Sequence, residues 1–456
     1  MRPAEPASDE SPEPSPAERR GRPPLVPRFL GQGYSEEQIA ARRAWVEEAT
    51  GARLERVGRA AIAGDEMRGN VENPIGAVQM PLGVAGPLHV RGEHAYGVFY
   101  VPFATTEGAL VRSYERGMVA ITRGGGAAVR VWADENRVAP LFTFADLETA
   151  AAFVRSLPGR FEAVRRAAEA TTGHGRVLRL VPHPLGREVI VEFVWSTGDA
   201  QGMNMIVRGS EAAGRELAAA CGAEGFELFS GLSGEKRASG SLLAGGKGKR
   251  VSAAVRLPRR VVETHLGCRA EALAAMWRRT VLGHLQSATL GYNGHYANGL
   301  AALFIATGQD VANVVNAAVG VTTLEATAQG DLHAAVNLPS LTVATVGGGT
   351  GLGTSHECLE MLGCAGAGKA AKLAEIVAAT LLAGELSMGA ALAGGDFVAG
   401  HERYGRNRPE DAEETGPKGG VDAGGDGAGD QGGGDLGGGD EGGGDDAGGA
   451  GREDAG

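Results

Sequence analysis

Two charged side chains have the chemistry to act on a carbonyl group, and the first is Glu107. It follows Thr105 and Thr106 and precedes a helical pattern that begins near Leu110. Because threonine is a good helix cap, one interpretation is that Glu107 completes the first turn of that helix. The other is a catalytic acid, since apolar neighbours remove solvent from a carboxyl group and favour its protonated, proton-donating form. The local sequence leaves both interpretations open.

The second is Lys236, in a loop of glycine and serine over residues 230–237. A lysine in such a loop is usually a solvated surface charge, and only the family resemblance given below makes Lys236 a candidate for stabilising an oxyanion. Asp310 lies in an alanine- and valine-rich helical pattern over residues 295–318. A carboxylate buried there needs a partner. It is therefore either a hydrogen-bonded structural residue or the ion-pair partner of Lys236.

Asn298 lies 12 residues before Asp310 in the same pattern. In a straight helix the two side chains would be about 120° apart around the axis. One site can use both only if the helix bends or breaks near Gly308.

Glycine turns mark three places where the backbone can approach a ligand closely. Residues 198–204 (G-D-A-Q-G-M-N) lie at a predicted strand-to-helix junction, where helix amides attract a pyrophosphate. Residues 345–350 (T-V-G-G-G-T) form a second flexible turn. The third, G-K-G-K at 246–249, lacks the spacing of a Walker A loop, and no G-x-G-x-x-G follows a strand. Neither nucleotide hydrolysis nor a Rossmann domain is predicted.

Five segments, in order, resemble those of 3-hydroxy-3-methylglutaryl-CoA (HMG-CoA) reductases. Residues 101–108 (V-P-F-A-T-T-E-G) are similar to the family signature V-P-M-A-T-T-E-G. The others are 72–88 (E-N-P-I-G-A-V-Q-M-P-L-G-V-A-G-P-L), 198–204, 295–310 (H-Y-A-N…G-Q-D) and 345–350. The resemblance covers roughly residues 72–408 and is to the biosynthetic form.

The resemblance implies an enzyme that reduces HMG-CoA to mevalonate and free CoA with two NADPH and no metal. It implies four catalytic residues: Glu107, Lys236, Asp310 and His401. His401 would lie on a mobile C-terminal flap and protonate the departing CoA thiolate. The implied cofactor-binding residues are Arg176, Asp199, Gln201, Gly202, Met203, Asn204, Gly347, Gly348 and Gly349. The implied substrate-binding residues are Arg137, Ser230, Arg237, Arg279 and Asn298.

Some positions depart from the family pattern. Gln201 stands where a methionine is expected, and Gly173 where an arginine commonly contacts the 2′-phosphate of NADPH. Arg176 and Arg179 are the alternative sources of that positive charge. The lysine loop, usually C-T-D-K-K, is the most divergent matched segment. Two alternatives therefore remain: an NAD-linked enzyme that oxidises mevalonate, and an inactive relative that acts as a binding protein through its acidic tail.

The predicted fold class is α+β, in several parts. Residues 1–34 are a disordered proline-rich segment, and 35–70 an N-terminal helical segment opened by a capping box at Ser35 with a helix to about Ala63. Residues 71–139 and 229–408 form a large substrate domain. Residues 140–228 form a small inserted domain, which the resemblance implies is ferredoxin-like and binds the nicotinamide cofactor. Within it the sequence predicts helices over 147–157, 161–170 and 203–220, and strands over 177–181 and 188–195.

Charge and composition bound the remaining expectations. Residues 409–456 carry 14 acidic and 2 basic side chains, a net of −12, whereas the whole 456-residue chain carries −11. The acidity thus belongs to a glycine- and aspartate-rich tail that we expect to be disordered, and nothing predicts nucleic-acid binding. Four scattered cysteines fit reduced thiols in a cytoplasm. No run of 18 apolar residues predicts a membrane span, although 370–393 is a long apolar helix expected in the core. The resemblance implies a homodimer or higher oligomer, with the lysine supplied by the neighbouring subunit.

Overall fold

The structure is a computed structural model that describes residues 25–29 and 33–395. Its first helix, α2, spans Glu36–Thr50 and begins with the predicted capping box between Ser35 and Gln38. It ends at Gly51, whose left-handed backbone (φ 72°) terminates the helix. The predicted continuation to about Ala63 is therefore wrong. A short helix, η1, follows at Gly64–Met67.

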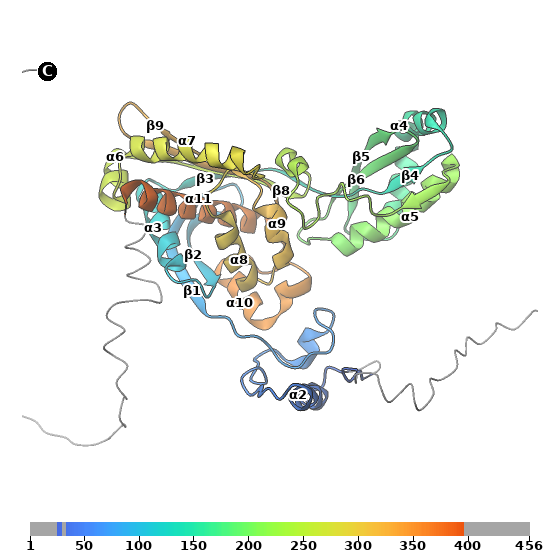
Figure 1. The fold of residues 1–456 in the computed structure, drawn as a ribbon, viewed down its shortest axis with the longest axis horizontal. Coiled ribbons are helices and arrows are strands. Elements are labelled where there is room, and N and C mark those ends of the chain that lie inside the picture. Colours follow the sequence, from blue (N-terminus) through green and yellow to red (C-terminus); the bar gives the residue numbers. More distant parts are fainter. Residues whose placement is uncertain (1–24, 30–32, 396–456) are drawn as a thin grey trace, which may run out of the picture. The chain divides into compact units, whose positions relative to one another are not determined.

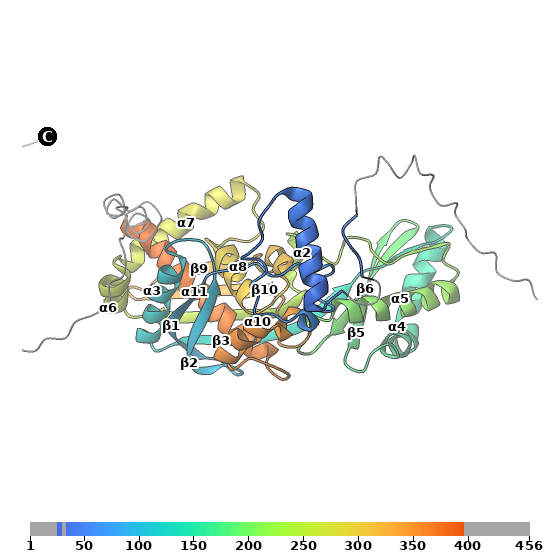
Figure 2. The same cartoon turned by 90° about the horizontal axis from the view of Figure 1, so that it is seen from below.

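The larger part of the structure is built around one sheet (Figure 1). Its strands are β1 (Leu82–Arg91), β2 (Tyr96–Ala104), β3 (Ala127–Val138), β8 (Gly248–Leu257), β9 (Val321–Ala326) and β10 (Leu332–Leu341). They lie in the order β2-β1-β3-β8-β10-β9, and every pair is antiparallel except the short pairing of β1 with β3. Because β1 lies between β2 and β3, the end of β2 that leads to Glu107 is fixed to the sheet. Figure 2 shows β1 and β2 together beside α3 (Leu110–Arg123).

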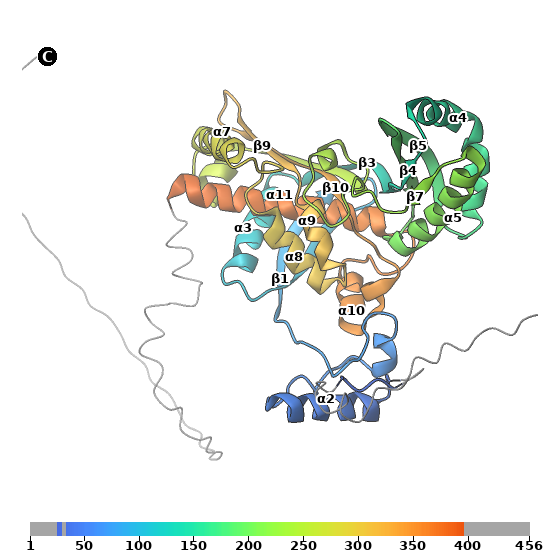
Figure 3. The same cartoon turned by 45° about the vertical axis from the view of Figure 1, so that its right-hand side comes forward.

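The central helix is α11 (Ala370–Gly394), which packs against α3, α7 (Ala270–Gln286) and α8 (Tyr296–Ala306). Its contact with α3 is close enough that a Cβ on Gly117 would lie 1.9 Å from the carbonyl oxygen of Ala383. The helix is long and apolar enough to cross a bilayer, but 78% of its apolar window is buried inside the protein. It is the core helix that the sequence predicts (Figure 3).

A second, smaller sheet is joined to the large sheet through the end of β3. Its elements are β4 (Leu141–Thr143), α4 (Leu147–Glu169), β5 (Arg176–Leu185), β6 (Glu188–Ser196), α5 (Met203–Cys221) and β7 (Gly225–Glu227). The strand order is β7-β4-β6-β5, all antiparallel, and α4 packs against α5. The last residues of β3, Asn136–Val138, pair with β6 and so join the two sheets. A separate aromatic core of Phe142, Phe153 and Trp195 fills this unit.

The predicted strands and the helix over 203–220 are confirmed in this unit, but the two helices predicted over 147–170 are one. Pro158 lies inside α4 without ending it. A proline removes one helical hydrogen bond and need not stop a helix whose apolar face is buried on both sides of it.

The helix predicted over residues 295–318 is interrupted. α8 ends at Ala306, and Gly308 has a left-handed backbone with φ 65°. The chain continues as η4 (Val311–Asn313) and α9 (Val314–Ala317). The remaining short elements are η2 (Gly240–Ala244), α6 (Arg259–Val261), η3 (Val262–Leu266), η5 (Gly348–Gly351) and α10 (Gly353–Met361).

Candidate active site

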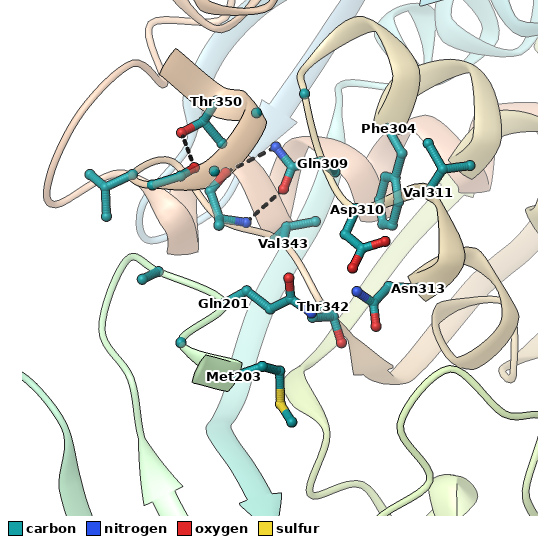
Figure 4. Close-up of a pocket in the computed structure, with 18 of the residues that line it drawn as sticks. Gln201, Met203, Phe304, Gln309, Asp310, Val311, Asn313, Thr342, Val343 and Thr350 are labelled. Carbon is teal, nitrogen blue, oxygen red and sulfur yellow. Dashed lines mark hydrogen bonds between the residues drawn. The ribbon is translucent and has the colours of Figure 1, made fainter. Parts of the chain in front are cut away.

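A cavity of about 800 Å³ lies where the start of α5 meets the segments around Asp310 and the glycine turn at 347–349. Figure 4 shows Gln201 and Met203 on one side, with Asp310 and Asn313 facing them. Lys236 and Glu235 complete the wall. Segments far apart in the sequence thus enclose one space.

Lys236 and Asp310 meet in this wall. The ammonium nitrogen of Lys236 lies 2.7 Å from Oδ2 of Asp310, and both side chains remain partly exposed. Lys236 has a left-handed backbone (φ 51°), which non-glycine residues adopt rarely. The other carboxylate oxygen of Asp310 accepts a hydrogen bond from the backbone N–H of Ala312. The pair forms within one chain, so this contact needs no neighbouring subunit.

The backbone before Asp310 is fixed by contacts that the sequence reasoning missed. The side-chain amide of Gln309 donates to the carbonyl of Ala344 and accepts from its N–H, at 3.0 and 2.8 Å (Figure 4). Gly308 lies so close to Gly349 that an added Cβ would be 2.2 Å from the Gly349 carbonyl oxygen. The sequence contains Gln309 within the motif G-Q-D. Only the fold shows that its side chain hydrogen-bonds to the backbone of Ala344.

The predicted cofactor turn divides into two parts. Gln201, Gly202, Met203 and Asn204 line the cavity, as do the three glycines Gly347, Gly348 and Gly349. Asp199 instead accepts hydrogen bonds from the backbone N–H groups of Gly368 and Ala370 at the start of α11. Burial alone would raise the pKa of Asp199, but these N–H groups together lower it. Asp199 therefore connects the turn to the core helix rather than lining the cavity.

A second cavity of about 690 Å³ contains Glu107. The side-chain amide of Asn298 donates to both carboxylate oxygens of Glu107, at 3.1 and 2.9 Å. The lining combines apolar groups with Arg112, Arg116 and His295. This arrangement suits an elongated ligand with both apolar and anionic parts.

The structure contradicts the helix-turn interpretation of Glu107 and the argument that its carboxyl group loses solvent. The residue precedes α3, whose N-cap is Ala109 with φ 69° and no side-chain capping bond, so Glu107 does not complete a helix turn. Thr105 instead accepts a hydrogen bond from the Glu107 backbone N–H. The carboxyl group was expected to lose solvent among apolar neighbours, yet Glu107 is exposed in the single chain. Phe103 and Ala104 are buried in β2, whereas the carboxyl group of Glu107 lies outside the sheet.

The two cavities lie toward opposite ends of α8. Asn298 is in its first turn, whereas Asp310 lies beyond its last residue, Ala306. The helical rise from 298 to 306 is about 12 Å. The structure thus pairs Lys236 with Asp310 and Glu107 with Asn298, but in separate cavities. His401 lies outside the described residues.

Four predicted substrate residues have other surroundings. Arg137 is buried and pairs with Glu192 at 3.3 Å, so an internal carboxylate already occupies its guanidinium group. The hydroxyl of Ser230 donates to the carbonyl of Ala139. The Arg237 guanidinium lies 5.0 Å from the ring centre of Phe229, and Arg279 is exposed on α7. None of the four is among the residues that line the two cavities.

The two arginines expected near a 2′-phosphate differ in their partners. Arg179 makes two hydrogen bonds of 2.6 Å with Glu135. Arg176 lies 3.9 Å from Glu169 and is about half exposed. Arg176 is therefore the less tightly held cation of the two.

The first cavity fits a nicotinamide nucleotide. Gly202, Gly347 and Gly348 have left-handed backbones that place main chain, without side chains, on its wall. The N-cap of α5 is Gly202, which has no side chain, so the first N–H groups of the helix receive no capping bond from it. Oδ1 of Asn313 is buried without a hydrogen-bond partner among the described residues, so a ligand carboxamide could supply the missing donor.

Comparisons with known proteins agree on one family. The model of the hydroxymethylglutaryl-coenzyme A reductase family matches residues 38–406. The chain is 42% identical over 374 residues to the 3-hydroxy-3-methylglutaryl-coenzyme A reductase of Methanothermobacter thermautotrophicus, covering 81% of this chain and 94% of that one. It is 41% identical over 372 residues to the enzyme of the same name from Haloferax volcanii, covering 80% and 92%.

The fold is also similar to a solved structure. The class II 3-hydroxy-3-methylglutaryl-CoA reductase from Streptococcus pneumoniae, bound to NADPH in open conformations, aligns with a TM-score of 0.59 and 18% identity. The alignment covers 80% of this chain and all of that one. At this identity the match supports the architecture alone.

Proposed function

Since this chain belongs to the hydroxymethylglutaryl-coenzyme A reductase family and is an oxidoreductase of the mevalonate pathway with that activity, we propose that it is the biosynthetic form, reducing HMG-CoA to mevalonate and CoA with two NADPH. The observation that carries the residue assignment is the 2.7 Å contact between Lys236 and Asp310 in the wall of the glycine-lined cavity. A fixed ammonium group there suits a carbonyl that becomes an oxyanion.

The two reductions place different demands on the protein. Two reduced nicotinamides, bound one after the other, would each supply one hydride, the first to the thioester carbon and the second to the aldehyde carbon. Lys236 stabilises the negative oxygen that forms each time, and Asp310 holds the ammonium group in place. After the first reduction the carbon–sulfur bond breaks, and the CoA thiolate takes a proton. His401 is the proposed donor, because an imidazole titrates near neutral pH.

Glu107 is the proposed proton donor to the new hydroxyl group. Because Glu107 and Lys236 line separate cavities of one chain, we propose that the lysine acting with it comes from a neighbouring copy. The support for Glu107 is that the amide of Asn298 donates to both of its carboxylate oxygens in a cavity lined by apolar and charged groups.

We assign this second cavity to the acyl-CoA. Its apolar wall suits the pantetheine chain. Arg112 and Arg116 are its arginines, and a phosphate there would compete with their contacts to Glu115 at 2.7 Å and to the hydroxyl of Ser387 at 3.0 Å.

The small unit is the proposed cofactor domain. Its connectivity, strand-helix-strand-strand-helix-strand, and its strand order β7-β4-β6-β5 support a ferredoxin-like fold. The family uses a nicotinamide cofactor, and Arg176 supports NADPH because it is a half-exposed cation at the start of β5. The domain limits 71–139, 140–228 and 229–408 are part of the same proposal, as is a cytoplasmic location.

A homo-oligomer is the proposed assembly. Five apolar side chains of β1 and β2 are between 52% and 77% exposed: Leu82, Val84, Tyr96, Val98 and Tyr100. Within the described residues β2 pairs only with β1, so its other edge is open. Natural proteins cover such apolar edges, and a second copy would do so here while bringing a second set of active-site residues near the first.

The deciding experiment measures oxidation of the reduced nicotinamide by absorbance, with HMG-CoA and either NADPH or NADH at low concentration. We expect two nicotinamides oxidised per CoA released, and a higher kcat/KM with NADPH. A preference for NADH together with faster mevalonate oxidation would support the NAD-linked alternative. A ratio of one would contradict the two-step reduction.

A further inference from the structure

The glycine-lysine motif at 246–249 places a lysine inside the protein. Lys247 has no exposed surface, although lysine is almost never fully buried without a partner. Gly246 and Gly248 on either side have left-handed backbones, with φ 88° and 86°. A Cβ on Gly248 would lie 2.4 Å from the carbonyl oxygen of Leu341. The motif is therefore a turn that directs one ammonium group inward at the start of β8.

Lys247 contacts two segments of the cavity wall at once. Its ammonium group makes an ion pair with Oε2 of Glu235, the residue directly before Lys236. It also lies 3.1 Å from the sulfur of Met203, the first residue of α5 in the cofactor turn. Asn136 donates to the carbonyl of Gln201 and contacts the same sulfur. One buried cation thus joins the lysine loop to the cofactor turn.

Burying this ion pair costs free energy, because both charged groups lose their contact with water. Burial lowers the pKa of Lys247, Glu235 opposes this, and the nearby cations Arg137 and Lys236 lower it further. Apart from Lys247, Oε2 of Glu235 has no hydrogen-bond partner among the described residues. Buried ion pairs are weak evidence for stability, whereas they can specify a geometry. The geometry next to this pair is the left-handed backbone of Lys236, which needs external support.

A second buried cation holds the same loop from its other side. Arg137 donates to the carbonyl of Ser233 and to the hydroxyl of Ser241 while it pairs with Glu192. The loop around Lys236 is therefore fixed at several points before and after its tip. Lys247 differs from Arg137 because it also reaches the cofactor turn.

We propose that Lys247 is a positioning residue of the reductase site: through Glu235 it sets the place of Lys236, and through Met203 it sets that place relative to the nicotinamide. The inference rests on the proposed role of Lys236. It predicts that loss of Lys247 lowers the rate of both hydride transfers more than it weakens binding. Lys247 is fully buried and is not among the residues that line the two cavities.

The test is Lys247→Met, which keeps an unbranched side chain one atom shorter and removes its charge. Lys249→Met is the matched control, because Lys249 lies two residues along β8, is 3% exposed and pairs with Asp134 at 2.9 Å. For each variant, circular dichroism establishes the folded fraction, and steady-state assays with HMG-CoA and with mevaldehyde give kcat and KM. Fluorescence titration gives the Kd of NADPH.

We expect kcat of Lys247→Met to fall on the order of 100-fold on both substrates, the cost of misplacing a reacting group by about 1 Å. The KM for HMG-CoA should change by less than about threefold, since the cavity contacts remain. Lys249→Met should lower the melting temperature but leave kcat of the folded enzyme near that of the parent. If the two variants have equal kcat, the role of Lys247 is structural and the inference is wrong.

Two further variants keep the outcome decisive. If Lys247→Met does not fold, the neutral pair Lys247→Met with Glu235→Gln leaves no unpaired buried charge and is measured instead. It should recover folding but not kcat, and recovery of both would overturn the inference. Lys236→Ala separates the two claims. If that variant keeps full activity, the proposed function of Lys236 fails; if it is inactive while Lys247→Met is fully active, only the inference on Lys247 fails.

Discussion

The two ends of α8 hold their carboxylates in opposite ways. Beyond its last turn, Asp310 faces an ammonium group, and its backbone is fixed by the amide contacts of Gln309. In its first turn, Asn298 holds Glu107 through a neutral amide, and Glu107 sits in a short segment between β2 and α3. One end is an ion pair supported from several elements, while the other is held by a neutral amide; Lys236, Asp310 and Glu107 are all exposed in the single chain.

The difference matches two kinds of chemistry. A charge that stabilises an oxyanion works best when it is already in place, because no reorganisation is then needed during the reaction. A proton donor must instead exchange its proton with solvent or substrate between turnovers, and an exposed carboxyl group can do so. The comparison therefore supports the proposed charge stabilisation by Lys236 and the proposed proton transfer by Glu107.

Removal of the ammonium group should have the largest effect. We expect Lys236→Ala to lower kcat by on the order of 10³-fold or more for both HMG-CoA and mevaldehyde, because both reductions pass through an oxyanion. The measurement is steady-state kinetics on each substrate. An effect on only one of them would restrict Lys236 to that step and weaken the assignment of the ionic end.

Neutralising Glu107 tests the other end. We expect Glu107→Gln to lower kcat by about 10²–10⁴-fold, the usual contribution of a positioned acid. The melting temperature should stay unchanged, because Glu107 is exposed and lies outside α3. A large loss of melting temperature would instead return Glu107 to a structural role. The control is Glu211→Gln, which removes an exposed carboxylate that pairs with Arg215 on α5.

The close contact between Gly308 and Gly349, near Asp310, can be disrupted without changing any charge. Gly308→Ala would place a Cβ 2.2 Å from the carbonyl oxygen of Gly349, at a backbone φ of 65°. We expect about 1–3 kcal/mol of destabilisation and a kcat loss of about tenfold or more as Asp310 moves. Gly186→Ala is the matched control, because Gly186 has φ 69° and nothing within 4 Å of an added Cβ. It carries the same backbone strain without the collision.

The sequence predicted some contacts of the charged residues better than their surroundings. An ion pair between Lys236 and Asp310 was one of two interpretations of Asp310, and the structure contains it. The helix breaks at Gly308, but Asn298 and Asp310 still line separate cavities.

The surroundings depend on contacts between distant segments, which local patterns do not encode. Gln309 reaching Ala344, Lys247 reaching Met203 and Arg137 pairing with Glu192 are all of this kind. The helix break predicted between residues 157 and 161 was wrong, because burial of the apolar face of α4 outweighs the low helix propensity of Pro158.

The smallest expected effect concerns Asp199, which fixes the cofactor turn to α11 near the ionic end. Its folded-state pKa lies below the usual value, so the carboxylate adds stability above pH about 4, its unfolded pKa, and loses it as pH falls through the lower folded value. We expect Asp199→Asn to lose about 0.3–1 kcal/mol at neutral pH, the worth of a charge at a helix N-terminus. The difference from the parent should disappear in acid, as thermal melts at several pH values would show.

Asp146→Asn is the control for that measurement. Asp146 caps α4 by accepting a hydrogen bond from the N–H of Thr149. The Thr149 hydroxyl and this N–H both lower the pKa of Asp146. Both variants should therefore share the acid dependence of stability. Of the two variants, only Asp199→Asn should weaken NADPH binding, because Asp199 belongs to the turn that lines the cavity and Asp146 does not. Equal NADPH affinity in the two variants would show that the turn keeps its place without this contact, and that the ionic end is preorganised by Gln309 and Lys247 alone.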